Sequence, residues 1–163
     1  MKELISNKVA EVSEYLPKDK SGAPIVPVDL SLILEKYNIG LRAVAFNEQD
    51  VAGAFDRNKR CIYVNDTDPK TRKIFTVAHE LGHYFLHQDV GRDVLFRERP
   101  ARDSHGHRNV IETEADLFAA QLLMPESTIR VFWPFTESIQ QLADIFSVSY
   151  IAMKNRLQYL GFI

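Results

Sequence analysis

The sequence predicts an α+β fold in which several helices pack around a small three-stranded antiparallel sheet. Apolar residues recur at helical spacing near both ends of the chain, whereas between residues 41 and 65 they form short runs bounded by turn formers. The chain has 163 residues, which is enough to bury one hydrophobic core. We therefore expect one domain over residues 1–163, with a C-terminal helical part at about 126–163.

Two helices are expected before the sheet. Over residues 2–16 apolar side chains recur every three or four positions, which is typical of an amphipathic helix, and Pro17 ends the pattern. A second, shorter helix is expected over residues 29–37, because Asn38 and Gly40 follow it as stop signals.

The middle of the chain changes to a strand pattern. Three short runs are rich in apolar and β-branched residues, at positions 41–46, 51–55 and 61–65. Turn formers and charged residues separate these runs. This spacing predicts a meander in which each strand pairs in antiparallel fashion with the next.

Helical spacing returns after the strands. Pro69 directly follows an aspartate that can serve as an N-cap, which predicts a helix from Pro69 to about His87. Residues 88–111 are charged and irregular, which predicts a mobile, solvated loop. Further helices are expected at 112–124, 137–146 and 149–160.

Composition excludes several classes of protein. The formal net charge is -2 and the pI is about 6.2, which argues against a strongly nucleic-acid-binding or membrane-surface domain. The single cysteine, Cys61, cannot form an internal disulfide, which favours a reducing compartment. The N-terminus lacks the apolar core of a signal peptide, and no stretch reaches the ~20 apolar residues of a membrane span. We expect a cytoplasmic protein without membrane contacts.

The strongest functional signal is the run His79-Glu80-Leu81-Gly82-His83, which matches His-Glu-x-x-His. Two histidines four positions apart on a helix project from one face, so both rings can reach one zinc ion. The glutamate between them can take a proton from a metal-bound water. The pattern predicts a zinc site held by His79 and His83, with Glu80 as the catalytic base.

The rest of this helix supports that interpretation. On a helical wheel the polar stripe consists mainly of the proposed site residues, and nearly all the remaining arc is apolar. A helix of this kind is buried. Burying histidines and a glutamate there would destabilise the fold unless their polar atoms found partners, and a metal ion is such a partner.

A catalytic zinc needs a third protein ligand. The metzincin continuation, with a glycine and a third histidine shortly after His83, is absent, so this ligand must come from farther along the chain. Glu114 shares a helix face with apolar residues and is favoured over Glu112, which points away alongside Asp116. His87 lies too far along the helix axis to share the ion and is expected to support the ligands or to have a structural role. His105 and His107 are expected to be solvated residues of the loop, and the lesser alternative is that one of them stabilises the oxyanion.

Several motifs together resemble the ImmA/IrrE-type metallopeptidases. The resemblance covers most of the chain and lies in the segments Val77–His87, Glu114–Ala120, Leu122–Pro125, Val26–Asp29, Gly53–Phe55 and Arg156–Gly161. It implies a zincin-like fold in which a small sheet lies beside the metal helix, with Glu114 as the third ligand. It also implies a zinc endopeptidase that cleaves a helix-turn-helix repressor. The chain leaves no room for an N-terminal repressor domain, so that partner is expected to be a separate protein.

The sequence is also compatible with two other classes of function. Residues 142–149 and the helix after them, with Lys154, Asn155 and Arg156, have a helix-turn-helix pattern that would suit a DNA-binding regulator. The usual turn glycine is missing, and the second helix is apolar enough for a packed helical hairpin, so direct nucleic-acid binding is not expected. The third class is a non-hydrolysing regulatory or toxin–antitoxin protein on the same fold.

Overall fold

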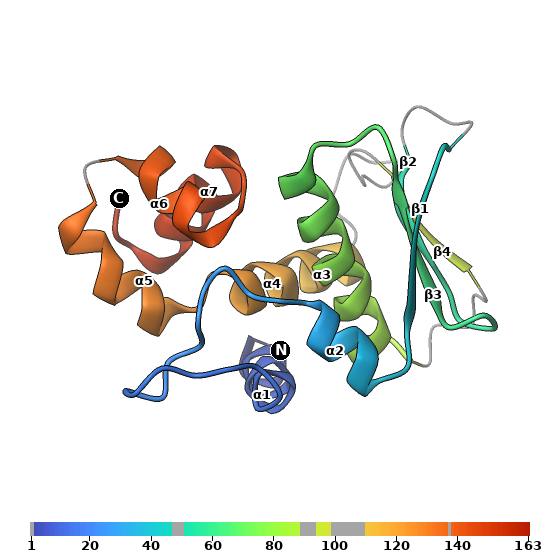
Figure 1. The fold of residues 1–163 in the computed structure, drawn as a ribbon, viewed down its shortest axis with the longest axis horizontal. Coiled ribbons are helices and arrows are strands. Elements are labelled where there is room, and N and C mark those ends of the chain that lie inside the picture. Colours follow the sequence, from blue (N-terminus) through green and yellow to red (C-terminus); the bar gives the residue numbers. More distant parts are fainter. Residues whose placement is uncertain (1, 47–50, 89–93, 99–109, 137) are drawn as a thin grey trace.

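A four-stranded sheet stands at one side of the molecule, and helix α3 lies between this sheet and the other helices (Figure 1). The computed structural model describes residues 2–46, 51–88, 94–98, 110–136 and 138–163. Its elements are, in chain order, α1 (Lys2–Ser13), α2 (Ser31–Lys36), β1 (Gly40–Val44), β2 (Val51–Asp56), β3 (Cys61–Asn65), α3 (Lys70–Leu86), β4 (Val94–Glu98), α4 (Val110–Leu123), α5 (Glu126–Phe132), the 3-10 turn η1 (Trp133–Phe135), α6 (Ile139–Phe146) and α7 (Tyr150–Leu160).

The sheet differs from the expected meander in two respects. Its order is β1-β3-β2-β4, so it has four strands, and β1 pairs with β3 in parallel instead of with β2. Strand β2 pairs in antiparallel fashion with both β3 and β4. The burial of the strands explains this order, because every residue of β2 is buried, as suits a central strand, whereas β1 is mostly exposed and takes an edge.

The segment that was expected to be a loop contains strand β4. Residues 94–98 pair with β2, so the prediction of an irregular loop over residues 88–111 is wrong for this part. The expected roles of His105 and His107 lie outside the described residues. The sequence shows no clean alternation at 94–98, and the strand forms because β2 offers it an open edge.

The helices agree with the sequence predictions to within a few residues at each end. Helix α3 contacts β2 and β3 on one side and α4 on the other, and α1 packs against both helices. One cluster of buried apolar side chains extends from α1 to α7. None of the described helices is both long and apolar enough to cross a membrane.

Candidate metal centre

The histidines and the glutamate of the motif lie in the buried part of α3. His79, Glu80 and His83 are 1%, 0% and 2% exposed. The end of this helix is fixed by Arg57, from the turn after β2, which donates hydrogen bonds to the backbone carbonyls of His87 and Gln88. A guanidinium at this position satisfies free carbonyls and complements the helix dipole. The turn between β2 and β3 therefore helps to hold the metal helix in place.

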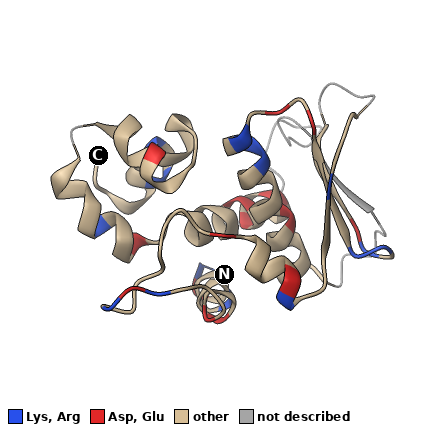
Figure 2. Cartoon of the chain, viewed as in Figure 1, with Lys and Arg blue, Asp and Glu red and all other residues tan. Residues whose placement is uncertain are grey.

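A close contact between α3 and α4 positions the site. A Cβ atom added at Gly82 would lie 3.0 Å from the Cα and 3.1 Å from the carbonyl oxygen of Ala115. Only glycine allows the backbones to approach so closely. Acidic positions of α4 lie where it passes α3 (Figure 2). The glycine inside the motif thus has a structural role, because it brings α4 within reach of the two histidines.

The third side chain at the histidine pair is Glu112. The Nε2 atoms of His79 and His83 are 3.0 Å apart. The Oε2 atom of Glu112 lies 3.2 Å from Nε2 of His79, and its Oε1 atom lies 3.1 Å from Nε2 of His83. These three side chains form a group that could hold a metal ion.

The structure corrects the expected third residue, which was Glu114. Its Oε2 atom lies 2.8 Å from Nε2 of His87 instead. The helical wheel assumed that α4 turns its large apolar side chains toward the site. Helix α4 approaches α3 through the small residue Ala115, and Glu112 lies on that side. A carboxylate among apolar residues does need a partner, but for Glu114 the partner is a histidine.

Asp116 supports the first histidine, a role that the sequence reading did not identify. Its Oδ1 atom lies 2.8 Å from Nδ1 of His79. In the neutral ring the proton therefore sits on Nδ1, which leaves the lone pair on Nε2 to face Glu112. Asp116 lies one helical turn after Glu112, and this spacing was the available signal, because a residue four positions from a ligand shares its face.

His87 supports the second histidine, as expected. Its Nε2 atom faces the carboxylate of Glu114, so the ring proton of neutral His87 sits there and its Nδ1 accepts. That Nδ1 atom lies 3.1 Å from Nδ1 of His83, which must then be the donor. The chain from His83 through His87 to Glu114 again leaves the lone pair of His83 on Nε2.

Three acceptors therefore converge on one point, which is where a cation fits. Two imidazole lone pairs and a carboxylate would repel each other at 3.0–3.2 Å unless a positive ion lay between them. Tetrahedral zinc with bonds of 2.0–2.2 Å separates its ligand atoms by about 3.3–3.6 Å, slightly more than these distances. Two histidines and one carboxylate form a donor set typical of catalytic zinc.

Local electrostatics favour the protonation states that a metal requires. Burial lowers the pKa of His83, and the nearby His79 and His87 lower it further, against an opposing effect of Glu112. Burial alone would raise the pKa of Glu112, but in the metal-free site hydrogen bonds from Nε2 protons of His79 and His83, which a metal ion would replace, outweigh this and hold the pKa well below its ordinary value. The site thus favours neutral His83 and an ionised carboxylate.

Glu80 faces the sheet. A Cβ atom added at Gly53 of β2 would lie 3.7 Å from Oε1 of Glu80, and it would collide with Thr76 of α3 at 2.3 Å. Glycine at this position lets β2 approach the metal helix. The carboxylate of Glu80 is consequently enclosed between α3 and the central strand, beside the proposed metal ligands.

The chain matches the family model of the IrrE N-terminal-like domain (Peptidase M78) over residues 34–158, a range that includes every site residue described above. It is 36% identical over 101 residues to the radiation response metalloprotease IrrE of Deinococcus radiodurans, which covers 60% of this chain and 30% of IrrE. It is 30% identical over 90 residues to the metallopeptidase ImmA of Bacillus subtilis, covering 53% of this chain and 50% of ImmA.

A solved structure described as a transcriptional regulator of Mycobacterium tuberculosis shares the fold. The TM-score is 0.63 at 16% sequence identity, and the match covers 95% of this chain and 46% of that one. The chain thus spans about half or less of the length of each of these proteins.

Proposed function

This chain belongs to the family of the IrrE N-terminal-like domain, as its motifs predict, and we propose that it is a zinc-dependent endopeptidase. In this proposal His79, His83 and Glu112 hold the zinc ion, and Glu80 is the catalytic acid–base group. The observation that carries the proposal is the convergence of three acceptor groups at 3.0–3.2 Å on one buried point. A His-Glu-x-x-His helix whose histidines are each oriented through Nδ1 adds to it.

In the proposed hydrolysis each residue of the site has a different role. A bound zinc ion would lower the pKa of a coordinated water to about 7 and polarise the carbonyl of the scissile peptide bond. Glu80 accepts a proton from the attacking water and delivers it to the amide nitrogen of the leaving group. Asp116 and His87 keep the two imidazole rings in the orientation that the ligands need.

For the substrate we propose a separately encoded helix-turn-helix repressor, whose cleavage would relieve repression of phage, mobile-element or stress genes. The support is the family resemblance of the sequence motifs. We also propose a cytoplasmic location, consistent with a single cysteine.

A cleavage assay tests this proposal. Zinc-loaded protein is incubated with the repressor encoded nearest to its gene, and the products are identified by mass spectrometry. We expect one discrete cut that chelator abolishes and that the Glu80→Gln variant makes at a rate at least ~10²-fold lower. An intact repressor would contradict the substrate. If unrelated peptides also stayed intact, the non-hydrolysing class of protein would be favoured.

The DNA-binding alternative has one observation in its favour and one against. Ser147, between α6 and α7, adopts a left-handed conformation with φ of 53°, so a tight turn forms without glycine. Arg156, one of the expected DNA-contacting residues, is buried instead, and its Nε donates to the carbonyl of Met124. We propose that the protein does not bind nucleic acid directly, and salt-dependent binding of duplex DNA by the isolated protein would contradict this.

A further inference from the structure

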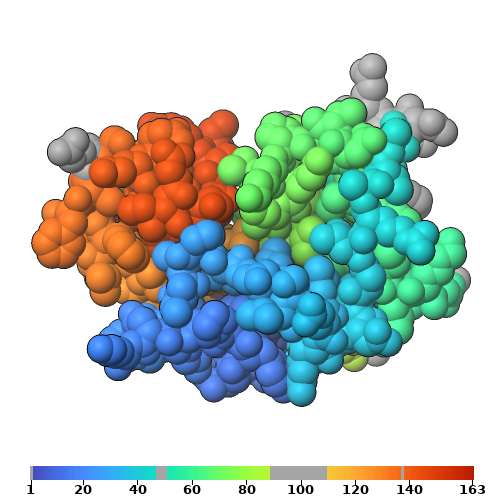
Figure 3. All heavy atoms as spheres, in the orientation of Figure 1, coloured from blue at the N-terminus to red at the C-terminus, as the bar shows by residue number. Residues whose placement is uncertain are grey.

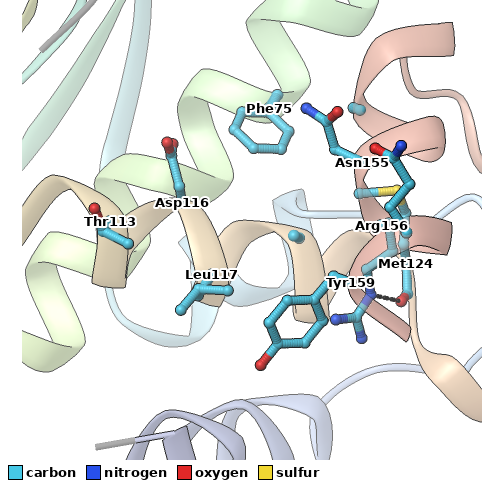
Figure 4. A pocket seen from close by; sticks show the side chains of 11 residues that line it. Phe75, Thr113, Asp116, Leu117, Met124, Asn155, Arg156 and Tyr159 are labelled. Atoms are coloured by element: carbon cyan, nitrogen blue, oxygen red, sulfur yellow. Dashed lines mark hydrogen bonds between the residues drawn. The ribbon is translucent and has the colours of Figure 1, made fainter. Parts of the chain in front are cut away.

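A pocket lies beside the metal centre, between helices α4 and α7. Its volume is about 370 Å³, and Phe75 of α3 closes one end (Figure 4). In the space-filling view a groove separates the C-terminal helices from α3 at this place (Figure 3). Ligand sites range from about 300 to 1,000 Å³, so this pocket suits a side chain and a short stretch of backbone better than a large ligand.

Two facing stripes of side chains form its walls. Along α4 the stripe includes Thr113, Leu117 and Ala120, and along α7 it includes Ala152, Arg156 and Tyr159. Within each stripe the residues are three or four positions apart, so each stripe is one helix face. Leu117, Tyr159 and Phe75 make the interior largely apolar, and the two alanines leave the space open.

The floor of the pocket is held rigidly. Arg156 is 5% exposed, and its Nε donates to the carbonyl of Met124 at 3.1 Å. Its guanidinium carbon lies 5.6 Å from the centre of the Tyr159 ring, a cation–π contact that fixes this wall. A preformed pocket of this kind binds a side chain without a large cost in ordering its own residues.

The pocket adjoins the metal centre at Asp116, on the Nδ1 side of His79. This residue lines the pocket, and its carboxylate contacts Nδ1 of His79. Leu117 follows Glu112 by five positions, which is about 7.5 Å along the helix axis and about 140° around it. An extended peptide advances about 3.3 Å per residue, so this axial separation corresponds to about two or three residues of a bound chain.

We propose that this pocket is a specificity subsite for the substrate polypeptide. It takes one large apolar side chain (leucine, methionine or phenylalanine) within about three residues of the scissile bond. The proposal rests on the proposed peptidase function and adds to it a preference that the metal ligands alone do not provide.

Cleavage-site profiling tests this preference. The zinc-loaded protein digests a proteome-derived peptide library, and mass spectrometry identifies the cut sites. We expect a large apolar residue to be enriched at one fixed position within three residues of the cut. Ala152→Phe fills the pocket and should lower kcat/KM for these peptides about tenfold or more. Ile151→Phe is the matched control, because Ile151 is 68% exposed and does not line the pocket.

A second variant covers the case in which Ala152→Phe fails to fold. Leu117→Ala enlarges the pocket, so it should shift the preferred residue at the same position toward larger aromatic side chains. Cut sites without an apolar preference, or a preference that neither variant changes, would overturn the proposal.

A binding measurement separates this proposal from the peptidase function. N-acetyl-L-phenylalaninamide is titrated into Glu80→Gln protein that carries 13C-labelled alanine methyl groups, and NMR spectra are recorded. We expect saturable shifts at Ala120 and Ala152 that N-acetylglycinamide does not produce. Such binding, together with zinc-loaded wild-type protein that cleaves no peptide, would contradict the proposed function but keep the apolar site. Cleavage without these shifts would overturn the site but keep the proposed function.

Discussion

The α3–α4 pair and the α6–α7 pair pack in contrasting ways. Helices α3 and α4 meet at Gly82 and Ala115 and enclose histidines and carboxylates between them. Helices α6 and α7 instead bury large apolar side chains, Leu142, Phe146, Met153 and Leu157. A serine caps the N-terminus of each of these two helices, by accepting a hydrogen bond from a backbone N–H group.

This contrast separates the part of the fold that depends on a metal from the part that does not. A buried apolar side chain stabilises the native state by about 1.5–3 kcal/mol without any ligand. Buried acceptor groups that face one another destabilise it unless a cation binds. Metal removal should therefore loosen α3 and α4 before α6 and α7.

The largest effect should come from Glu80, which acts on the reaction and not on the packing. We expect Glu80→Gln to lower the cleavage rate at least ~10²-fold, because the base is lost, while zinc content and melting temperature stay unchanged. Steady-state kinetics and metal analysis of the same sample measure both quantities. Glu126→Gln, on the surface of α5, is the control. Cleavage by Glu80→Gln at the wild-type rate would exclude Glu80 as the base.

His87 tests the hydrogen-bond chain behind the second histidine. His87→Ala removes the acceptor that orients His83, so we expect zinc affinity to fall about 10–100-fold. Competition with a chromogenic chelator measures the affinity. His87→Gln retains a polar side chain and should lose less. An unchanged affinity in the alanine variant would show that His83 needs no such support.

Gly82 tests the close approach of α3 to α4. An alanine within a helix usually stabilises a protein by about 1 kcal/mol relative to glycine. Here the added methyl group would press on the backbone of Ala115, so we expect Gly82→Ala to destabilise the fold by roughly 1–3 kcal/mol and to weaken zinc binding. Urea unfolding with and without zinc gives the sign, and a stabilised variant would contradict the close packing.

Ser147, between α6 and α7, is a position where substitution should stabilise the fold, in contrast to Gly82. It is a non-glycine residue in the left-handed region, which strains the backbone. We expect Ser147→Gly to stabilise the protein by roughly 0.5 kcal/mol, because relief of strain exceeds the added entropy of the unfolded chain. Zinc affinity should stay the same. A change in zinc affinity would show that the two pairs are coupled.

The sequence predicted the helices and the metal-binding motif because both depend on local spacing. Apolar periodicity and prolines define α3 and α4 to within a few residues, and the histidines at positions 79 and 83 face each other because they are one turn apart. Asp116 follows from the same rule applied to Glu112, and it was missed because the wrong glutamate had been favoured.

The pairing of the strands and the third site residue depend on contacts between distant segments. Nothing local in residues 40–44 shows that this strand lies beside β3, and β4 forms on an edge that β2 provides. Glu112 and Glu114 differ only in which side of α4 approaches α3. The contact between Gly82 and Ala115 decides this, and a helical wheel of α4 alone does not contain it.

Metal titration of matched variants tests the central claim most directly. Zinc affinity and stoichiometry are measured for wild type, Glu112→Gln and Glu114→Gln. We expect one zinc ion per wild-type chain and a loss of at least about 100-fold in affinity for Glu112→Gln, because the carboxylate beside both Nε2 atoms is neutralised. Glu114→Gln still offers His87 an oxygen acceptor, so its affinity should stay within about tenfold of wild type. Tight binding by Glu112→Gln together with loss of zinc from Glu114→Gln would contradict the site described here.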